Sequence, residues 1–245
     1  MRILLLGGTT EAGGMARLLA AAGIDAIYSY AGRTSAPVGQ PLPMRIGGFG
    51  GVEGMAAFLR ETAVTHVIDA THPFAAQISR NAVAASALTG SGLIALERPA
   101  WVEQPGDHWT DVADFPAAAA ALPGDGKGVF LAIGRQNLAP FLAIRQRWLL
   151  RFAEVAAHPL PGATLIASRG PFTVAGDVQL MRRHDIRHVV TKNAGGSAAQ
   201  AKLVAARELG LGVVMIRRPD LPPRRLAATP VEVMDWLHGN ADRGV

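Results

Sequence analysis

The sequence contains no cysteine, which excludes disulfides and thiolate metal sites and is typical of a cytoplasmic enzyme. No apolar run approaches the roughly 20 residues that a membrane-spanning helix needs. The chain starts directly with a core-type apolar run, so we expect no signal peptide. The seven histidines are spread without the spacing of metal ligands, and we expect no metal site.

Lysine and tyrosine are also rare, and their scarcity excludes several reaction classes. Neither Tyr28 nor Tyr30 has a lysine four residues on, so the Y-x-x-x-K pair of short-chain dehydrogenases is missing. There is no G-x-x-x-x-G-K-[ST] phosphate loop and no G-x-S-x-G nucleophile elbow. Hydride transfer from a bound nicotinamide remains open, because it needs mainly positioning and one proton donor.

The net charge of +5 comes from 24 basic and 19 acidic residues, and only three of the basic residues are lysines. Such a surplus suits nucleic acid, a membrane surface or a small polyanion. There is no lysine-rich tail and no basic helix with interleaved aromatics, and the arginine pairs are scattered. We therefore expect a small polyanionic ligand, with no nucleic acid and no membrane partner; a merely solvated basic surface is the alternative.

The first fourteen residues, M-R-I-L-L-L-G-G-T-T-E-A-G-G, contain the clearest local signal. The apolar run Ile3 to Leu6 predicts a strand buried on both faces, and the helical spacing from Ala12 to Gly23 predicts a helix packed on the sheet. A strand, a glycine turn and a helix N-terminus present free N–H groups to an anion, most often a dinucleotide pyrophosphate. The G-x-G-x-x-G pattern is not matched, so an ordinary turn is the alternative. The residues expected to hold the cofactor here are Gly7, Gly8, Thr9, Thr10, Glu11 and Ala12.

The second predicted strand, residues 26–30, ends in an A-G-R-T-S stretch with no carboxylate. An NAD site would place an acidic residue there to bind the ribose hydroxyls. An arginine beside two hydroxyls instead suits a 2′-phosphate, so we expect NADPH, held by Gly32, Arg33 and Ser35. The alternative is a polar loop before Pro37.

Short apolar runs alternate with helical segments along all 245 residues. This pattern predicts an α/β fold of two doubly wound, Rossmann-like domains, with mainly parallel sheets facing a central cleft. The Gly-rich stretch 123–128 predicts the boundary, giving a cofactor-binding domain at 1–125 and a domain at 126–245 that completes the substrate cleft. Residues 103–112 are expected to be loop and edge structure. Predicted strands cover 3–6, 26–30, 44–46, 66–70, 93–96, 129–133, 149–155, 164–167, 188–191 and 212–216.

Two S/T-x-x-E/Q spacings and one proline predict helix starts. Ser197 with Gln200, and Thr229 with Glu232, have capping-box spacing. Thr71 or His72 is expected to cap the next helix, with Pro73 in its first turn. Asp69 is expected to be structural and to hold its loop through backbone N–H groups.

Most other polar candidates follow predicted strands, where α/β sheets bind ligands. Arginine suits carboxylates because its planar fork donates two parallel hydrogen bonds. Each single arginine could be an ordinary surface residue, but their shared position favours a ligand. The cationic members are Arg33, Arg98, Arg135, Arg169, Lys192 and Arg217.

Four stretches together resemble the precorrin-6A reductase family, NADPH-dependent enzymes of corrin ring biosynthesis. They are G-G-T-T-E-A at 7–12, D-A-T-H-P-F-A at 69–75, S-R-G-P-F at 168–172 and K-N-A-G-G at 192–196. Their order and spacing span most of the chain.

The resemblance implies hydride addition from NADPH to a C=C/C=N system of the precorrin-6A macrocycle, with protonation by Lys192 or His72, or by water. The substrate's acetate and propionate groups would account for the cationic strand ends. Neighbouring pathway enzymes are expected partners. Rival readings are a non-reducing tetrapyrrole enzyme resembling uroporphyrinogen synthase, and an NADP-binding sensor. The implied substrate site comprises Thr71, His72, Arg98, Arg135, Ser168, Arg169, Gly170, Lys192, Asn193, Gly195 and Gly196.

Overall fold

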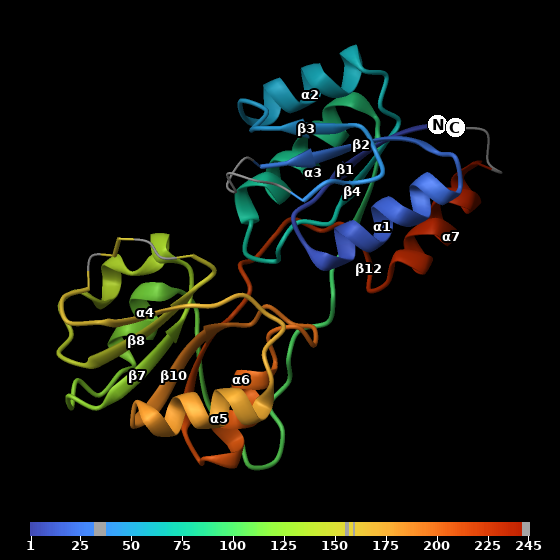
Figure 1. The fold of residues 1–245 in the computed structure, drawn as a ribbon. Coiled ribbons are helices and arrows are strands. Elements are labelled where there is room, and N and C mark those ends of the chain that lie inside the picture. The colour runs from blue at the N-terminus through green and yellow to red at the C-terminus, as the bar shows by residue number, and fades with distance from the viewer. Residues whose placement is uncertain (32–37, 155–156, 159, 242–245) are drawn as a thin grey trace. The chain divides into compact units, whose positions relative to one another are not determined.

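The computed structural model describes residues 1–31, 38–154, 157–158 and 160–241 (Figure 1). It divides into two compact units. Unit 1 comprises Met1–Pro99 with Asp220–Val245, and unit 2 comprises Ala100–Pro219. Among the described residues, each unit has one six-stranded sheet in which every pairing is parallel, so the predicted α/β fold with two parallel sheets is confirmed.

Unit 1 has the strand order β12-β5-β4-β1-β2-β3, with β1 in the interior. Helices α1 and α7 cover one face, and α2 and α3 cover the other (Figure 1). The elements are β1 (Arg2–Leu6), α1 (Thr10–Ala21), β2 (Asp25–Tyr30), β3 (Met44–Ile46), α2 (Gly51–Glu61), β4 (His66–Asp69), α3 (Ala76–Thr89), β5 (Gly92–Leu96), β12 (Arg225–Ala227) and α7 (Pro230–Ala241).

The apolar run of β1 has no polar face because both faces are buried. Ile3 and Leu5 pack among the residues of α1 and α7, and Leu4 and Leu6 pack among those of α2 and α3. Burial stabilises the fold by about 1.5–3 kcal/mol for each such side chain. The strand is thereby fixed, and the turn that follows it is held at the carboxyl edge of the sheet.

Unit 2 has the strand order β6-β11-β10-β7-β8-β9. Residues of α5 and α6, including Met181 and Leu203, share a core with Phe130 and Val189 of the sheet. The elements are β6 (His108–Val112), α4 (Phe115–Ala120), β7 (Gly128–Ala132), 3-10 helices at Arg135–Asn137 and Ala139–Phe141, β8 (Arg147–Phe152), β9 (Thr164–Ala167), α5 (Val174–Arg183), β10 (Ile186–Lys192), α6 (Ala201–Glu208) and β11 (Gly212–Ile216).

The division into units differs from the expected boundary at residue 125. Strand β6 pairs with β11 and so belongs to unit 2, whereas β12 returns to pair with β5 in unit 1. The stretch at 123–128 is a tight connection inside unit 2, where Asp125 accepts a hydrogen bond from the Lys127 backbone N–H at 3.2 Å. The chain instead passes between units near Pro99 and near Pro219.

The predicted helix starts have mixed outcomes. Thr229 and Glu232 form their capping box, with the Glu232 N–H donating to Thr229 Oγ1 at 3.3 Å and Glu232 Oε2 accepting from the Ala228 N–H at 2.9 Å. The Ser197 box is wrong, because α6 begins only at Ala201 and its N-cap has no side-chain hydrogen bond. Within the described residues, no helix is long and apolar enough to cross a membrane.

Candidate active site at two sheet edges

The turn after β1 is held in place by Tyr28 of β2. The Gly8 N–H donates to the Tyr28 hydroxyl at 2.9 Å, and a Cβ at Gly7 would lie 2.1 Å from Tyr28 Cζ, so only glycine fits there. Gly8 has φ +116° and open space where a side chain would stand. Burial raises the pKa of Tyr28 to about 12, so its hydroxyl stays protonated at physiological pH. The turn therefore leaves room above it for a ligand.

Thr9 joins this turn to the neighbouring strand. Its Oγ1 accepts from the Ala12 N–H at 3.1 Å, capping α1, and donates to the Ala70 carbonyl after β4 at 2.9 Å. Strands β1 and β4 pair at the point where the strand order reverses, which is where doubly wound sheets bind ligands. The open N-terminal turn of α1 also favours an anion. The chain's own residues thus fit a dinucleotide pyrophosphate.

Glu11, in the first turn of α1, has an ion-paired carboxylate. It forms an ion pair with Arg98, which follows β5, at 2.8 Å between Oε2 and the guanidinium nitrogen. The structure thus brings together a residue predicted to hold the cofactor and one predicted to hold the substrate. The Arg98 guanidinium offsets the negative charge of Glu11 next to the turn where a pyrophosphate would bind.

The loop after β4 is organised by Asp69, as expected. Its buried carboxylate accepts from the Thr71 N–H at 3.2 Å and from Thr71 Oγ1 at 2.7 Å. His72 Nδ1 accepts from the Phe74 N–H at 3.2 Å. The expectation that Thr71 or His72 caps the next helix is wrong, because residues 72–75 form a separate turn and α3 begins at Ala76 without a side-chain cap.

Gly32, Arg33 and Ser35 lie outside the described residues. Elsewhere in unit 1, Arg45 of β3 donates to Ser29 Oγ at 3.0 Å and to the Gly47 and Gly48 carbonyls at 2.9 and 3.0 Å, and its guanidinium stacks 3.8 Å from the Phe49 ring. Desolvation lowers its pKa. Arg45 therefore braces its own loop.

The segment Lys192–Gly196, which begins at the last residue of β10, is braced by Trp101 and Arg218. Asn193 Oδ1 accepts from the Trp101 N–H at 2.8 Å, and its Nδ2 donates to the Trp101 carbonyl at 2.9 Å. Trp101 Nε1 donates to the Gly196 carbonyl at 2.7 Å. Arg218 donates to the Asn193 and Ala194 carbonyls at 3.0 and 3.3 Å.

Predicted cations lie along the carboxyl edge of the unit 2 sheet. Lys192 ends β10, Arg135 opens the 3-10 helix after β7, Arg169 follows β9 and Arg217 follows β11. From β11 to β9 the edge spans four strand spacings, roughly 19 Å. Arg135 is exposed, and Arg169 is exposed and paired with Glu154. Ser168 is fixed by its N–H, which donates to the Phe152 carbonyl, and Gly170 precedes a cis proline.

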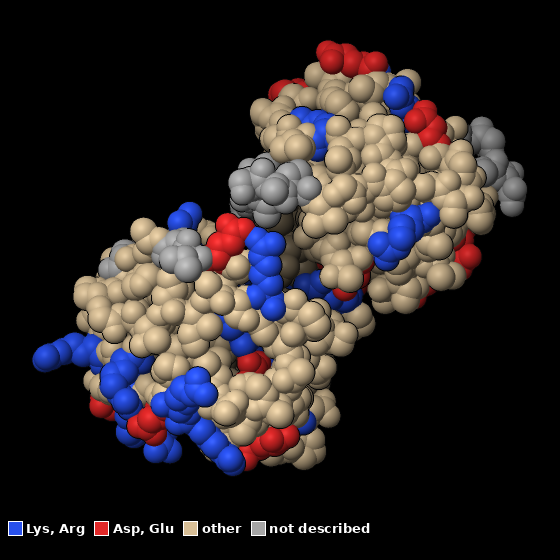
Figure 2. All heavy atoms as spheres, viewed as in Figure 1, with Lys and Arg blue, Asp and Glu red and all other residues tan. Residues whose placement is uncertain are grey.

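The charge of the molecule is concentrated in one unit. Unit 2 carries 14 basic and nine acidic residues, whereas unit 1 carries ten of each, so the whole net charge of +5 belongs to unit 2. Figure 2 shows the Lys and Arg spheres gathered more densely on unit 2. Unit 2 is therefore the part suited to a polyanion.

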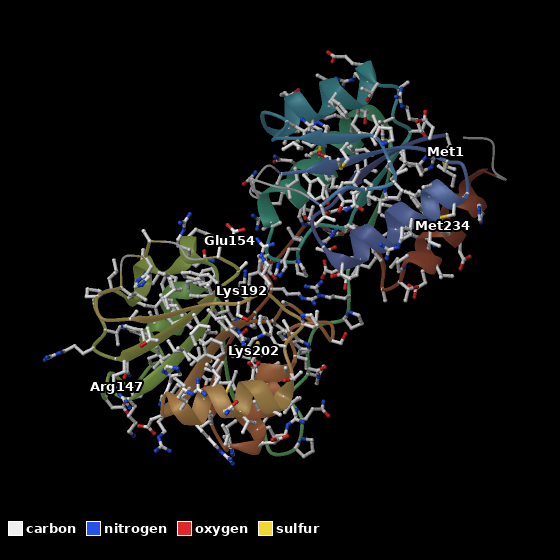
Figure 3. The ribbon with its side chains drawn as sticks, viewed as in Figure 1. Met1, Arg147, Glu154, Lys192, Lys202 and Met234 are labelled. Atoms are coloured by element: carbon white, nitrogen blue, oxygen red, sulfur yellow. The ribbon has the colours of Figure 1, made fainter. Side chains whose placement is uncertain are left out.

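Two further cations of unit 2, Arg151 and Lys202, form a largely buried cationic cluster. Arg151 pairs with Asp177 at 2.5 Å and stacks 3.6 Å from the ring of Phe172, the last residue of the S-R-G-P-F motif. Lys202 of α6 is only 5% exposed and lies 4.8 Å from the Trp101 ring. Figure 3 labels Lys192 and Lys202 in this unit.

Sequence reasoning missed five supporting residues: Tyr28, Arg45, Trp101, Lys202 and Arg218. Their contacts join segments up to 95 residues apart, so no local spacing signals them. The one available signal was rarity, since Lys202 is one of three lysines and sits near the start of a helix. Among the described residues, no group of three His, Asp or Glu side chains could hold a metal ion.

The fold and these two edges define a Rossmann-like α/β protein with a glycine turn on one unit and a cationic edge on the other. A family model described as "Precorrin-6x reductase CbiJ/CobK" matches residues 2–238. The chain belongs to this family, whose members are reductases of cobalamin biosynthesis, so the predicted family and activity class are confirmed.

Individual relatives match over nearly their whole length. The precorrin-6A reductase of Rhodobacter capsulatus is 57% identical over 249 residues, covering 100% of this chain and 99% of the relative. The cobalt-precorrin-6A reductase of Priestia megaterium is 31% identical over 250 residues, covering 96% and 97%. A solved structure, that of CobK precorrin-6A reductase, superposes with a TM-score of 0.92 at 56% identity, covering 100% of this chain and 98% of that one.

Proposed function

We propose that this protein reduces precorrin-6A to precorrin-6B with NADPH. The observation that carries the proposal is the full-length match to reductases of this family, together with 57% identity to a precorrin-6A reductase. Relatives named for the metal-free substrate are 40–57% identical, and those named for the cobalt form are 27–31% identical. We therefore favour the metal-free macrocycle.

NADPH is proposed to bind to unit 1. Gly7, Gly8, Thr9, Thr10, Glu11 and Ala12 would hold the pyrophosphate, and Gly32, Arg33 and Ser35 would hold the 2′-phosphate. When bound, the nicotinamide supplies a hydride. The open space above Gly8 and the helix N-terminus behind it support this placement.

The macrocycle is proposed to bind to the cationic edge of unit 2, and Thr71 and His72 of unit 1 are proposed as further substrate contacts. Arg135, Arg169 and Lys192 would pair with its carboxylates, because charge-assisted bonds to carboxylates are the strong ones. Asn193, whose amide is bound to Trp101, would act by holding Lys192 in place. The remaining proposed contacts are Arg98, Ser168, Gly170, Gly195 and Gly196.

The reduction adds a hydride to one ring atom and a proton to the other. Lys192 and His72 are the proposed donors. His72 Nδ1 accepts a hydrogen bond from the Phe74 N–H, so Nε2 is the ring nitrogen that would carry a proton for the substrate. The meeting of the two sites at a central cleft, the cytoplasmic location and the pathway partners stay predictions.

The test is an anaerobic assay of NADPH oxidation with metal-free and with cobalt-containing precorrin-6A. We expect the nicotinamide absorbance to fall with the metal-free macrocycle. NADPH binding without turnover would favour the sensor, and conversion of the macrocycle without NADPH would favour the non-reducing enzyme.

The 2′-phosphate proposal has its own test. Arg33→Ala should raise the KM for NADPH far more than the KM for NADH, because only NADPH carries the phosphate. An equal effect on both would reject that role for Arg33.

A further inference from the structure

Lys202 is a buried lysine whose positive charge has no anion of its own. Its Nζ donates to the Ala199 carbonyl at 2.6 Å and faces the Trp101 ring at 4.8 Å. Within the described part of the chain, no carboxylate forms a salt bridge with it. A buried, unpaired ammonium is costly, and the usual response is to lose the proton.

The charged groups around Lys202 do not remove this cost. Among the described residues, Asp177 of α5 is the carboxylate whose charge acts on Lys202, and Asp177 is already paired with Arg151 of β8 at 2.5 Å. Lys192, at the end of β10, adds a further positive charge. The cluster therefore has a surplus of positive charge before any ligand binds.

Burial lowers the pKa of Lys202 from 10.5 to about 7, and the charges of Arg151 and Lys192 lower it further against the opposing effect of Asp177. Near neutral pH, Lys202 is consequently balanced between amine and ammonium. An anion arriving over Lys192 would shift this balance toward the ammonium, since a nearby negative charge favours the protonated form.

Lys202 also contacts Trp101, a residue that is hydrogen-bonded to the segment Lys192–Gly196. Its Nζ contacts the Trp101 ring, whose Nε1 binds the Gly196 carbonyl, and donates to the carbonyl of Ala199, which follows that segment in the chain before α6. An ammonium strengthens both contacts, because charged donors form stronger hydrogen bonds and a cation is attracted to a ring face.

We propose that Lys202 takes up one proton when the polycarboxylate macrocycle binds over the segment Lys192–Gly196, and that its ammonium then braces this segment as a positioning residue. The neutral amine gains a proton from solvent and becomes the ammonium, and no other bond changes. The inference rests on the proposed binding of the macrocycle to unit 2.

The test is calorimetric titration of the whole protein with metal-free precorrin-6A, anaerobically and without NADPH. Heats are compared at pH 8 in HEPES and in Tris, whose ionisation enthalpies differ, so that their difference counts the protons taken up. We expect uptake approaching one proton at pH 8 and close to zero at pH 6. Between pH 7 and 9 the Kd should weaken by up to about tenfold for each pH unit.

Lys202→Met should abolish the uptake and flatten this pH dependence. Lys202→Gln is a second variant in case the first fails to fold. Lys127→Met is the matched control, because Lys127 is a 58% exposed lysine of the same unit, paired with Asp125, and its loss should leave the uptake unchanged. A purely structural role for Lys202 would weaken binding equally at every pH.

The outcomes separate the two proposals. Binding by the wild type without proton uptake, or uptake that persists in the Lys202 variants, would overturn the role of Lys202 and leave the proposed function standing. A wild type that binds NADPH yet gives no heat with the macrocycle would overturn the proposed function itself, and the role of Lys202 with it.

Discussion

Asn193 and Trp101 bind each other through both halves of the asparagine amide: Oδ1 accepts from the Trp101 N–H at 2.8 Å, and Nδ2 donates to the Trp101 carbonyl at 2.9 Å. The Asn193 side chain thus binds the N–H and the carbonyl of Trp101 as the backbone of a neighbouring strand would. These two hydrogen bonds hold Asn193 against Trp101, near the start of unit 2, and thereby position the neighbouring Lys192.

Asn193→Ala should destabilise the protein by about 1–3 kcal/mol, because it leaves a buried N–H and a carbonyl without partners. The KM for the macrocycle should rise, and the Kd for NADPH should stay unchanged. Gln104→Ala is the control, since its exposed side-chain amide donates to the nearby Val102 carbonyl. Urea unfolding and steady-state kinetics measure both effects, and an unchanged KM would remove Asn193 from the positioning of Lys192.

Gly7→Ala should abolish NADPH binding and lower stability, because the new Cβ would lie 2.1 Å from the Tyr28 ring. Overpacking of this kind costs about 1–3 kcal/mol or more. Gly13→Ala, inside α1, is the matched control: its Cβ would lie 3.8 Å from its nearest atoms, on Arg17 and Gln40, and alanine favours a helix by about 0.5–1 kcal/mol. Cofactor fluorescence titration would measure the Kd, and a Gly7→Ala protein that binds NADPH normally would contradict the proposed pyrophosphate site.

Asp177→Ala should cost about 3–5 kcal/mol of stability, because it leaves the buried guanidinium of Arg151 without its carboxylate. The comparison is Asp185→Ala, which removes an exposed carboxylate paired with Arg147 and Arg187. Exposed pairs contribute about 0–1 kcal/mol. Equal losses in chemical denaturation would mean that burial does not decide the strength of the Arg151 pair.

Lys202→Met should stabilise the protein relative to wild type by an amount that depends on pH. In the wild type, the folded state binds fewer protons at Lys202 than the unfolded chain does between about pH 7 and 10.5, so wild-type stability rises across this window. Below pH 7 the buried charge penalises the folded state in full. The gain of the variant should therefore be larger at pH 6 than at pH 9.5, and a pH-independent difference in the free energy of unfolding would contradict a buried, titrating lysine.

The sequence predicted the parts of the fold whose pattern is local. The run Ile3 to Leu6 has no polar position because both of its faces are buried, and such a run identifies an interior strand. Strand β12 was missed because it has only three residues and Leu226 is exposed. Without β12 the return of the chain to unit 1 has no sequence signal, and the Gly-rich stretch 123–128, which predicts a boundary, lies inside unit 2.

In the candidate site, too, the residues with a local sequence signal could be predicted and the others could not. The motif residues Asp69, Thr71 and Lys192 were found because they directly follow strands. Trp101 and Lys202 were missed because their contacts depend on the three-dimensional arrangement of β10, α6 and the entry to unit 2. The expected cap of α3 was wrong because His72 binds the Phe74 N–H inside its own turn.

The most direct test of the central claim is a single turnover of the protein with metal-free precorrin-6A and NADPH deuterated at both C4 positions, followed by mass spectrometry of the macrocycle. We expect stoichiometric loss of the nicotinamide absorbance and a product that carries one deuterium and one solvent-derived hydrogen. A converted macrocycle without deuterium, or a macrocycle that returns unchanged, would contradict it.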